Sequence, residues 1–173
     1  MRTRFILLLL LCSATRLVAQ QTWTDHARLL PDRLRNIPAG INIYHSPTPV
    51  WPEFNSDTVD FPGKYIWKHS TRIATEAGEL EVIAAGSYIW WKDKGWTPNI
   101  DLNREDFAKF FNCPGGILKT GKAYTFLKNY RYGDALYPGD ALWFVLAKDK
   151  NGRIYKGIAL VETEGQLKTA DKN

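Results

Sequence analysis

The sequence predicts a mainly β protein, folded as an antiparallel β-sandwich or a partly open barrel with one or two short helices. Many short segments rich in β-branched and aromatic residues alternate with Gly, Pro, Asn and Asp turn signals. A single clear helical pattern interrupts them, so the β-α-β rhythm of a parallel sheet is absent. The segment 141–163 adds a third observation, because it reads as two interior strands of one hairpin.

The hairpin at 141–163 is centred on Asn151-Gly152, the dipeptide that favours a two-residue type I′ turn. This turn places Trp143 opposite Leu160 across the two strands. Both faces of both strands are apolar away from the turn, so neither face suits exposure to water along its length. We therefore expect strands that are covered on both sides.

Residues 1–20 have the features of a secretory signal peptide. Arg2 and Arg4 precede the short apolar run 5–11, which is too short to span a bilayer. We expect cleavage of this segment and a secreted or periplasmic protein. Of the 23 basic residues, three lie in this segment with no acid, which leaves 20 basic against 18 acidic residues. A net charge of about +2 gives no reason to expect a nucleic-acid partner.

The remaining segment, 21–173, is expected to form a single β-rich domain that does not span a membrane. Cys12 leaves with the signal peptide, so Cys113 is the one cysteine of the mature chain and no intramolecular disulfide can form. The core must therefore be stabilised by packing, for which seven Trp residues are available.

The first part of this domain combines a helical segment, a short strand and a packed loop. Segment 24–37 has helical spacing, but Pro31 would break a continuous helix, so short helical pieces are expected. A strand follows at 40–44. The loop 46–63 is too apolar for a linker, and we expect it to pack over the domain without regular structure because of its prolines, Pro47, Pro49, Pro52 and Pro62.

Strands are then predicted at 64–75 and 79–91, with a bulge or bend at Gly86. A short helix at 103–111 follows, with a capping residue, early acidic residues and phenylalanines at helical spacing. A further strand is expected at 123–132.

The tail 166–173 is polar, and we expect it to be frayed. The turn motifs between the strands are common to immunoglobulin-like and jelly-roll-like sandwiches and name no family.

The strongest candidate for a binding site is the aromatic segment 88–98. Neighbouring strand residues point to opposite faces, so at most one of Trp90 and Trp91 belongs to the main core. Exposed indoles suit stacking on a sugar or packing against a protein. The alternative is that these indoles only cover the core. The candidate ligand-binding residues are Trp90, Trp91 and Trp96 for stacking, and Lys92, Asp93 and Lys94 for hydrogen bonds.

A second aromatic row lies on alternate positions of the strand expected at 123–132. It could form a platform for an elongated ligand, but half of a sandwich core explains it better. Its members are Tyr124, Phe126, Tyr130 and Tyr132.

No metal site, cofactor site or catalytic residue is predicted. His26, His45 and His69 have no metal-ligand spacing, although His45 and His69 could converge in space. The alternating acidic run at 101–105 resembles a calcium loop, but a helix cap explains it better. No nucleophile or nucleotide-binding motif is present.

The sequence thus favours an exported, non-catalytic binding module that recognises a glycan or a cell-surface or envelope protein through aromatic side chains. The first alternative is a small secreted hydrolase that uses carboxylates, with His45 or His69 as acid or base. The second is a structural envelope component that pairs with another chain through a sheet edge.

Overall fold

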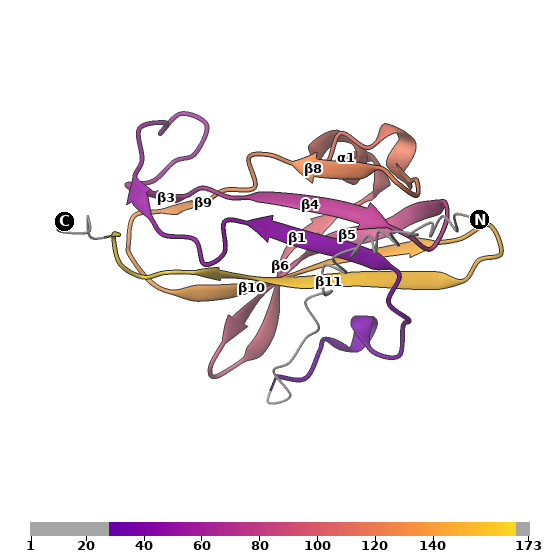
Figure 1. Ribbon diagram of the computed structural model, residues 1–173. Coiled ribbons are helices and arrows are strands. Elements are labelled where there is room, and N and C mark those ends of the chain that lie inside the picture. The colour runs from indigo at the N-terminus through magenta and orange to yellow at the C-terminus, as the bar shows by residue number, and fades with distance from the viewer. Residues whose placement is uncertain (1–27, 169–173) are drawn as a thin grey trace, which may run out of the picture.

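A computed structural model describes residues 28–168, and this part of the chain is mainly β, with antiparallel sheets and a short α-helix (Figure 1). The prediction of a mainly β protein is confirmed. The expected signal peptide at 1–20, the start of the segment 24–37 and the end of the tail 166–173 lie outside the described residues.

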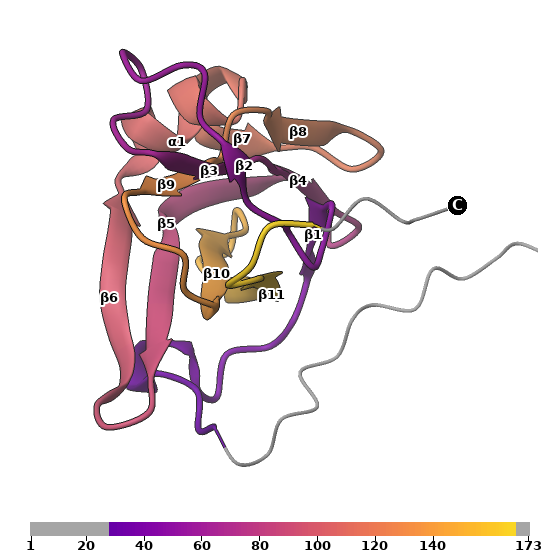
Figure 2. The ribbon, with the colours of Figure 1, turned by 90° about the vertical axis from the view of Figure 1, so that its left-hand side faces the viewer.

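The largest sheet has the strand order β11-β10-β5-β6, and β7 pairs with the other end of β5. Its strands are β5 (Leu80–Trp91), β6 (Gly95–Leu102), β7 (Ile117–Leu118), β10 (Gly139–Lys148) and β11 (Ile154–Thr163). β5 is the longest strand, and Figure 2 shows it running with β6 down to a protruding hairpin tip beside the N-terminal segment.

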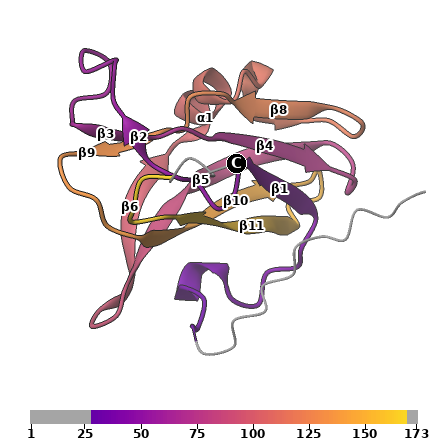
Figure 3. The same ribbon diagram turned by 60° about the vertical axis from the view of Figure 1, so that its left-hand side comes forward.

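Two smaller sheets complete the architecture (Figure 3). One has the order β1-β4-β8, built from β1 (Ile41–Ser46), β4 (Ser70–Thr75) and β8 (Ala123–Phe126). The other has the order β2-β3-β9, built from β2 (Glu53–Phe54), β3 (Tyr65–Trp67) and β9 (Arg131–Gly133). The strand order of each sheet is open, so none of them closes into a barrel within the described residues.

Residues flanking β1 join this strand to β11 of the large sheet. Parallel bridges connect Ala39 with Lys156 and Val50 with Thr163, one at each end of the contact. The backbone N–H of Val50 donates to the Glu162 carbonyl at 2.8 Å. The two sheets are thereby held edge to edge on this side of the molecule.

The main core contains side chains from the largest sheet and from the β1-β4-β8 sheet, and a second cluster lies on the opposite face of β10. Trp143 and Val145 belong to the main core, whereas Leu142 and Phe144 belong to the second cluster, together with Leu34. Leu34 lies in the 3-10 helix η1 (Asp32–Leu34), the described helical part of the predicted segment 24–37. β10 is therefore covered on both faces, as its sequence predicts.

The β10–β11 hairpin is correctly located, but the predicted type I′ turn is wrong. Gly152 has φ +80° whereas Asn151 does not have positive φ, and the Gly152 N–H donates to the Asp149 carbonyl at 3.0 Å. The loop is a type I turn followed by a glycine bulge. The register moves by one residue, so Trp143 pairs with Ala159 and not with Leu160.

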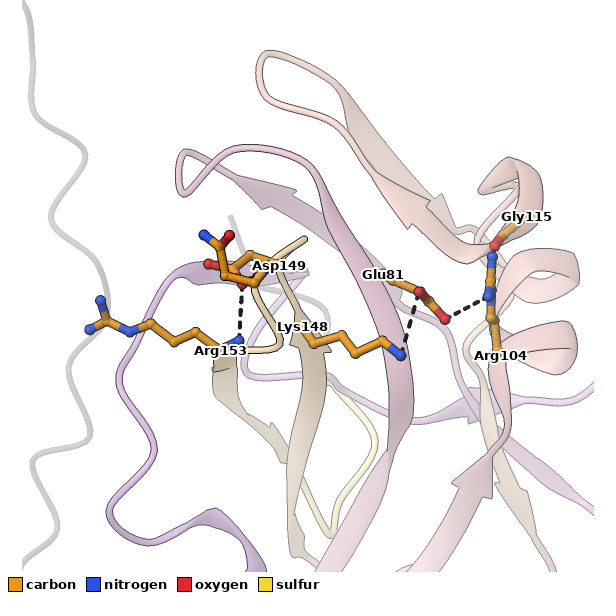
Figure 4. Close-up of polar contacts among 7 residues, drawn as sticks. Glu81, Arg104, Gly115, Lys148, Asp149 and Arg153 are labelled. Carbon is orange, nitrogen blue, oxygen red and sulfur yellow. Dashed lines mark hydrogen bonds and ion pairs between the residues drawn. The ribbon is translucent and has the colours of Figure 1, made fainter.

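The side chain of Asp149 explains this choice of turn. Its Oδ1 accepts hydrogen bonds from the backbone N–H groups of Asn151, at 2.8 Å, and Arg153, at 2.9 Å (Figure 4). An aspartate that bonds the backbone two residues ahead stabilises the type I geometry and outweighs the local preference of Asn-Gly.

Two predicted strands each split into two, because an antiparallel ribbon bends where they pair. Segment 64–75 yields β3 and β4, and segment 123–132 yields β8 and most of β9. Trp67 pairs with Arg131 on one side of the bend, and Thr71 pairs with Phe126 on the other. Residues 68–70 thus oppose residues 127–130, which hold one extra residue, as in a bulge that turns a corner between sheets.

The predicted helix at 103–111 is present as α1 (Arg104–Phe110). The Asn103 side chain caps it by accepting from the Asp106 N–H at 2.8 Å. Phe107 and Phe111 are fully buried, and their stacked rings dock the helix on the core. A 3-10 turn, η2 (Pro114–Gly116), follows.

Glu81 of β5 links this strand to α1 and to β10. It forms ion pairs with Arg104, at 2.7 Å, and with Lys148, at 3.6 Å (Figure 4). All three side chains are partly exposed to solvent, so these pairs contribute little to stability.

The loop 46–63 contains the short strand β2 and contributes buried Val50 to the main core. Phe61 contacts the Tyr130 ring with centroids 5.1 Å apart, whereas Phe54 is exposed. Over residues 28–168, no helix has the length and apolar character needed to cross a bilayer.

Candidate functional site

A cavity of about 520 Å³ lies beside the bend in the ribbon. Its walls come from β5, β6 and β9, from the start of β10 and from the end of β11, and Figure 2 shows these elements around one region of the molecule. This volume falls within the range of pockets that bind small molecules or part of a polymer.

The bend places two polar side chains at the floor of the cavity. His69 follows β3 and Asn129 precedes β9, and the two residues are 6% and 5% exposed. Ser87 of β5 is also buried there, and its Oγ accepts from the Asn99 side-chain amide at 3.1 Å. The floor is therefore polar in a protein whose other interior surfaces are mainly apolar.

His69 lies next to a second histidine, His45 of β1. Their ring centroids are 5.9 Å apart. Thr71 orders this pair: its Oγ1 accepts from the Asn129 amide at 2.7 Å and lies 2.9 Å from His45 Nδ1. The Thr71 hydroxyl donates to Nδ1 in one neutral tautomer of His45 and accepts from Nδ1–H in the other, so it pairs with His45 in both.

Three buried ring nitrogens of this pair have no hydrogen-bond partner among residues 28–168. They are His45 Nε2 and both ring nitrogens of His69. Buried polar atoms without partners are costly and uncommon in folded proteins. His69 lines the cavity, although both of its ring nitrogens are almost fully covered by protein.

Both histidines are neutral at physiological pH. Burial lowers the pKa of His69 to about 4. Burial, with a further contribution from the neighbouring His69, lowers the pKa of His45 to about 3. The backbone of Trp67 opposes the shift of the His69 pKa to a smaller extent, although it does not reach hydrogen-bond geometry. The floor thus offers donors and acceptors without charge.

The lining of the cavity includes three exposed aromatic rings. Trp91 is 48% exposed, Tyr132 44% and Tyr137 47%. They come from β5, from β9 and from the connection between β9 and β10. Aromatic faces in contact with solvent beside a polar floor are suited to stacking on a ring of a ligand.

Arg131 of β9 contributes a positively charged group to the cavity wall. Its guanidinium lies 4.4 Å from the centroid of the Trp67 ring and 4.2 Å from that of the Tyr137 ring. It donates to the Tyr137 carbonyl at 3.0 Å and to Thr163 Oγ1. In the part of the chain that the structure describes, no carboxylate forms an ion pair with Arg131.

Asp140, which also lines the cavity, differs from Arg131 because its charge is already compensated. It forms an ion pair with Arg28, whose guanidinium lies 4.9 Å from the centroid of the Trp90 ring. Arg28 therefore connects the N-terminal segment to the start of β10.

The structure separates the three tryptophans that the sequence singles out. The Trp90 and Trp96 rings form an edge-to-face pair 5.1 Å apart, and Trp96 packs against the cluster that contains Leu34. Trp91 lies on the other side of β5, in line with Ser87, which also lines the cavity. Their rings therefore do not form one continuous stacking surface.

The three polar candidates lie at the tip of the β5–β6 hairpin. Lys92 borders the cavity together with Trp90 and Trp91, whereas Asp93 and Lys94 are exposed and lie outside its lining. The Lys94 N–H donates to the Trp91 carbonyl at 3.3 Å and closes the turn.

The second aromatic row is divided by the bend. Tyr124 and Phe126 belong to the main core, whereas Tyr130 and Tyr132 line the cavity. The cavity also contains residues that sequence reasoning did not select, notably Asn129, Arg131 and Tyr137. One sequence feature could have identified two of the lining residues, because His69 and Asn129 are polar residues inside predicted strands.

Within residues 28–168, no group of three or more His, Cys, Asp and Glu side chains is placed to hold a metal ion. Cys113 is buried, and burial raises the pKa of its thiol to about 11. A thiol of this kind is a poor nucleophile at neutral pH.

No protein-family model matches the sequence, and no curated protein matches it.

Proposed function

We propose that this protein is a non-catalytic binding module that holds a glycan in the cavity beside the ribbon bend. The observation that carries this proposal is a cavity of about 520 Å³ whose lining combines exposed aromatic rings with buried, neutral polar groups. Sugars present apolar faces that stack on aromatic rings and hydroxyl groups that both donate and accept hydrogen bonds.

The polar groups at the floor of the cavity favour a ligand that enters the cavity over a protein that only covers its opening. His69 has two ring nitrogens without partners, and its neutral ring offers one donor and one acceptor. The lining also contains Ser87, Asn99 and Asn129, whose neutral side chains suit sugar hydroxyl groups. A glycan is therefore a better match than a cell-surface or envelope protein.

We further infer that the largest sheet and the β1-β4-β8 sheet form a sandwich-like pair, of the immunoglobulin-like or jelly-roll-like kind. Their shared core supports this arrangement. With the signal peptide expected at 1–20, the proposal places the protein outside the cytoplasm, where it would meet envelope or extracellular polysaccharides.

The test is retention of purified protein on insoluble polysaccharides and peptidoglycan. Trp91→Ala removes a ring beside the cavity, and we expect it to weaken retention by about tenfold or more, the scale of an aromatic contact in a binding site. Trp96→Ala is the matched control, because it removes the same side chain from the other face of the sheet.

Retention lost in Trp91→Ala and kept in folded Trp96→Ala would support the cavity as the glycan site. Equal retention of both variants would contradict the assignment of Trp91. If the wild-type protein is retained on none of the polymers, the proposal of a glycan-binding module fails.

The His45–His69 pair keeps a hydrolase as the second candidate function. A neutral imidazole at the floor of a cavity can act as a general base. The same polymers test this alternative: release of soluble sugar that stops in His69→Gln would identify a hydrolase, and intact polymer after prolonged incubation would contradict it.

A further inference from the structure

Arg131 is a partly buried cation that has no anionic partner among the described residues. It lines the cavity, and the ion pairs found in residues 28–168 do not include it. Removing a guanidinium from water is costly unless an anion or hydrogen bonds compensate. The two groups that accept hydrogen bonds from Arg131, Thr163 Oγ1 and the Tyr137 carbonyl, are both neutral.

The orientation of the guanidinium is fixed before a ligand arrives. The Trp67 and Tyr137 rings contact it with centroid distances of 4.4 Å and 4.2 Å, and Trp67 is fully buried. Two of the five N–H groups of Arg131 donate to Thr163 and Tyr137. The remaining N–H groups can donate to a planar oxyanion, which a guanidinium can bind in a bidentate manner.

The charges around the cavity favour an anion as well. Lys92 and Arg131 contribute two positive side chains to the lining, and Asp140 contributes one negative side chain that Arg28 already pairs. His69 adds no negative charge, since a neutral imidazole only donates and accepts hydrogen bonds. The charged side chains of the lining therefore carry a net positive charge.

We propose that the glycan is acidic and that the carboxylate of a uronic acid binds Arg131 while the sugar hydroxyls bind the polar floor. This inference rests on the proposed function and adds the chemical class of the ligand. The carboxylate compensates the charge of Arg131, and the neighbouring ring hydroxyls bind the neutral polar side chains of the lining.

The first experiment compares acidic and neutral forms of one sugar on the wild-type protein. Calorimetric titrations use an oligogalacturonate and an oligoglucuronate, and the fully methyl-esterified form of each as its neutral match. We expect an acidic form to bind about 10- to 100-fold more tightly than its ester, the range for hydrogen bonds to a charged group.

The second experiment assigns the effect to Arg131. Arg131→Gln should bring the affinity for the acidic form down to that for the ester, and Arg131→Lys should restore part of it. Arg153→Gln is the matched control, because Arg153 also contacts a tyrosine ring, that of Tyr155 at 5.2 Å, but lies at the β10–β11 turn and not in the cavity lining.

The outcomes separate this inference from the proposed function. Equal affinity of the wild-type protein for acid and ester would overturn the inference and leave a neutral-glycan module, and this result does not depend on any variant folding. An acid preference that survives in folded Arg131→Gln would overturn the role of Arg131. Tighter binding of an acidic peptide than of either uronate would overturn the choice of an acidic sugar. Absence of binding to every saccharide would remove the proposed function itself.

Discussion

Acidification is expected to destabilise this protein through its two buried histidines. Burial lowers the folded-state pKa to about 4 for His69 and about 3 for His45, whereas the ordinary value is 6.5. The unfolded chain therefore binds more protons than the folded chain once the pH falls below about 6.5. The stabilisation that the neutral pair provides is complete above that pH and is lost as the pH falls toward the folded-state values.

The size of the effect follows from these pKa values. Each histidine costs about 1.4 kcal/mol of unfolding free energy per pH unit below 6.5, so two histidines cost roughly 4 kcal/mol between pH 7 and pH 5. Most carboxylates stay ionised over this interval, which isolates the contribution of the histidines. A loss of this size is a large part of the stability of an ordinary domain.

Urea denaturation at pH 7, 6 and 5 measures this loss directly. With an m-value of about 2 kcal/mol per molar urea, the midpoint of the wild-type protein should fall by about 2 M across the series. The matched protein is the double variant His45→Gln, His69→Gln, which cannot titrate at these positions and should lose much less stability. Equal losses in the two proteins would refute the assignment of neutral, buried histidines.

Three further predictions concern packing and turns. Gly152→Val forces a β-branched residue to φ +80° without any clash, so it should cost about 1–3 kcal/mol of unfolding free energy in urea denaturation. Gly86→Ala should cost more unfolding free energy than Gly152→Val although Gly86 lacks positive φ, because its Cβ would lie 2.0 Å from the Ile100 carbonyl oxygen. A smaller loss than that of Gly152→Val would contradict the packing of β5 on β6. Leu34→Ala should cost about 2–5 kcal/mol of unfolding free energy, since Leu34 is the fully buried residue through which the N-terminal segment packs on β10. An unchanged urea midpoint would show that this segment does not cover β10.

Local chemistry explains which parts of the fold could be predicted. The apolar residues on both faces of 141–163 predicted strands covered on both sides, and the cluster around Leu34 provides the second cover. Asn103 and the phenylalanines after it predicted α1. These signals work because strand alternation, helix capping and helical spacing involve residues that are close in the sequence.

The turn at Asn151-Gly152 shows the limit of such signals. The dipeptide alone favours a type I′ turn, but the Asp149 carboxylate bonds two backbone N–H groups and selects a longer loop. The one-residue change in register then decides that Ala159, and not Leu160, shares a face with Trp143. A propensity for two residues was thus outweighed by a neighbouring side chain.

The sequence by itself determined the class of this fold, its longest hairpin and its helix, since each depends on short-range patterns. Alternation along β5 also established that Trp90 and Trp91 point to opposite faces. Only the tertiary structure decided that both border a cavity, where Trp91 is exposed and Trp90 packs against Trp96. It also decided that His69, Asn129 and Arg131 line the same cavity. The reason is one extra residue that bends a ribbon of two strands far apart in the sequence, and short-range sequence patterns do not predict such a long-range pairing.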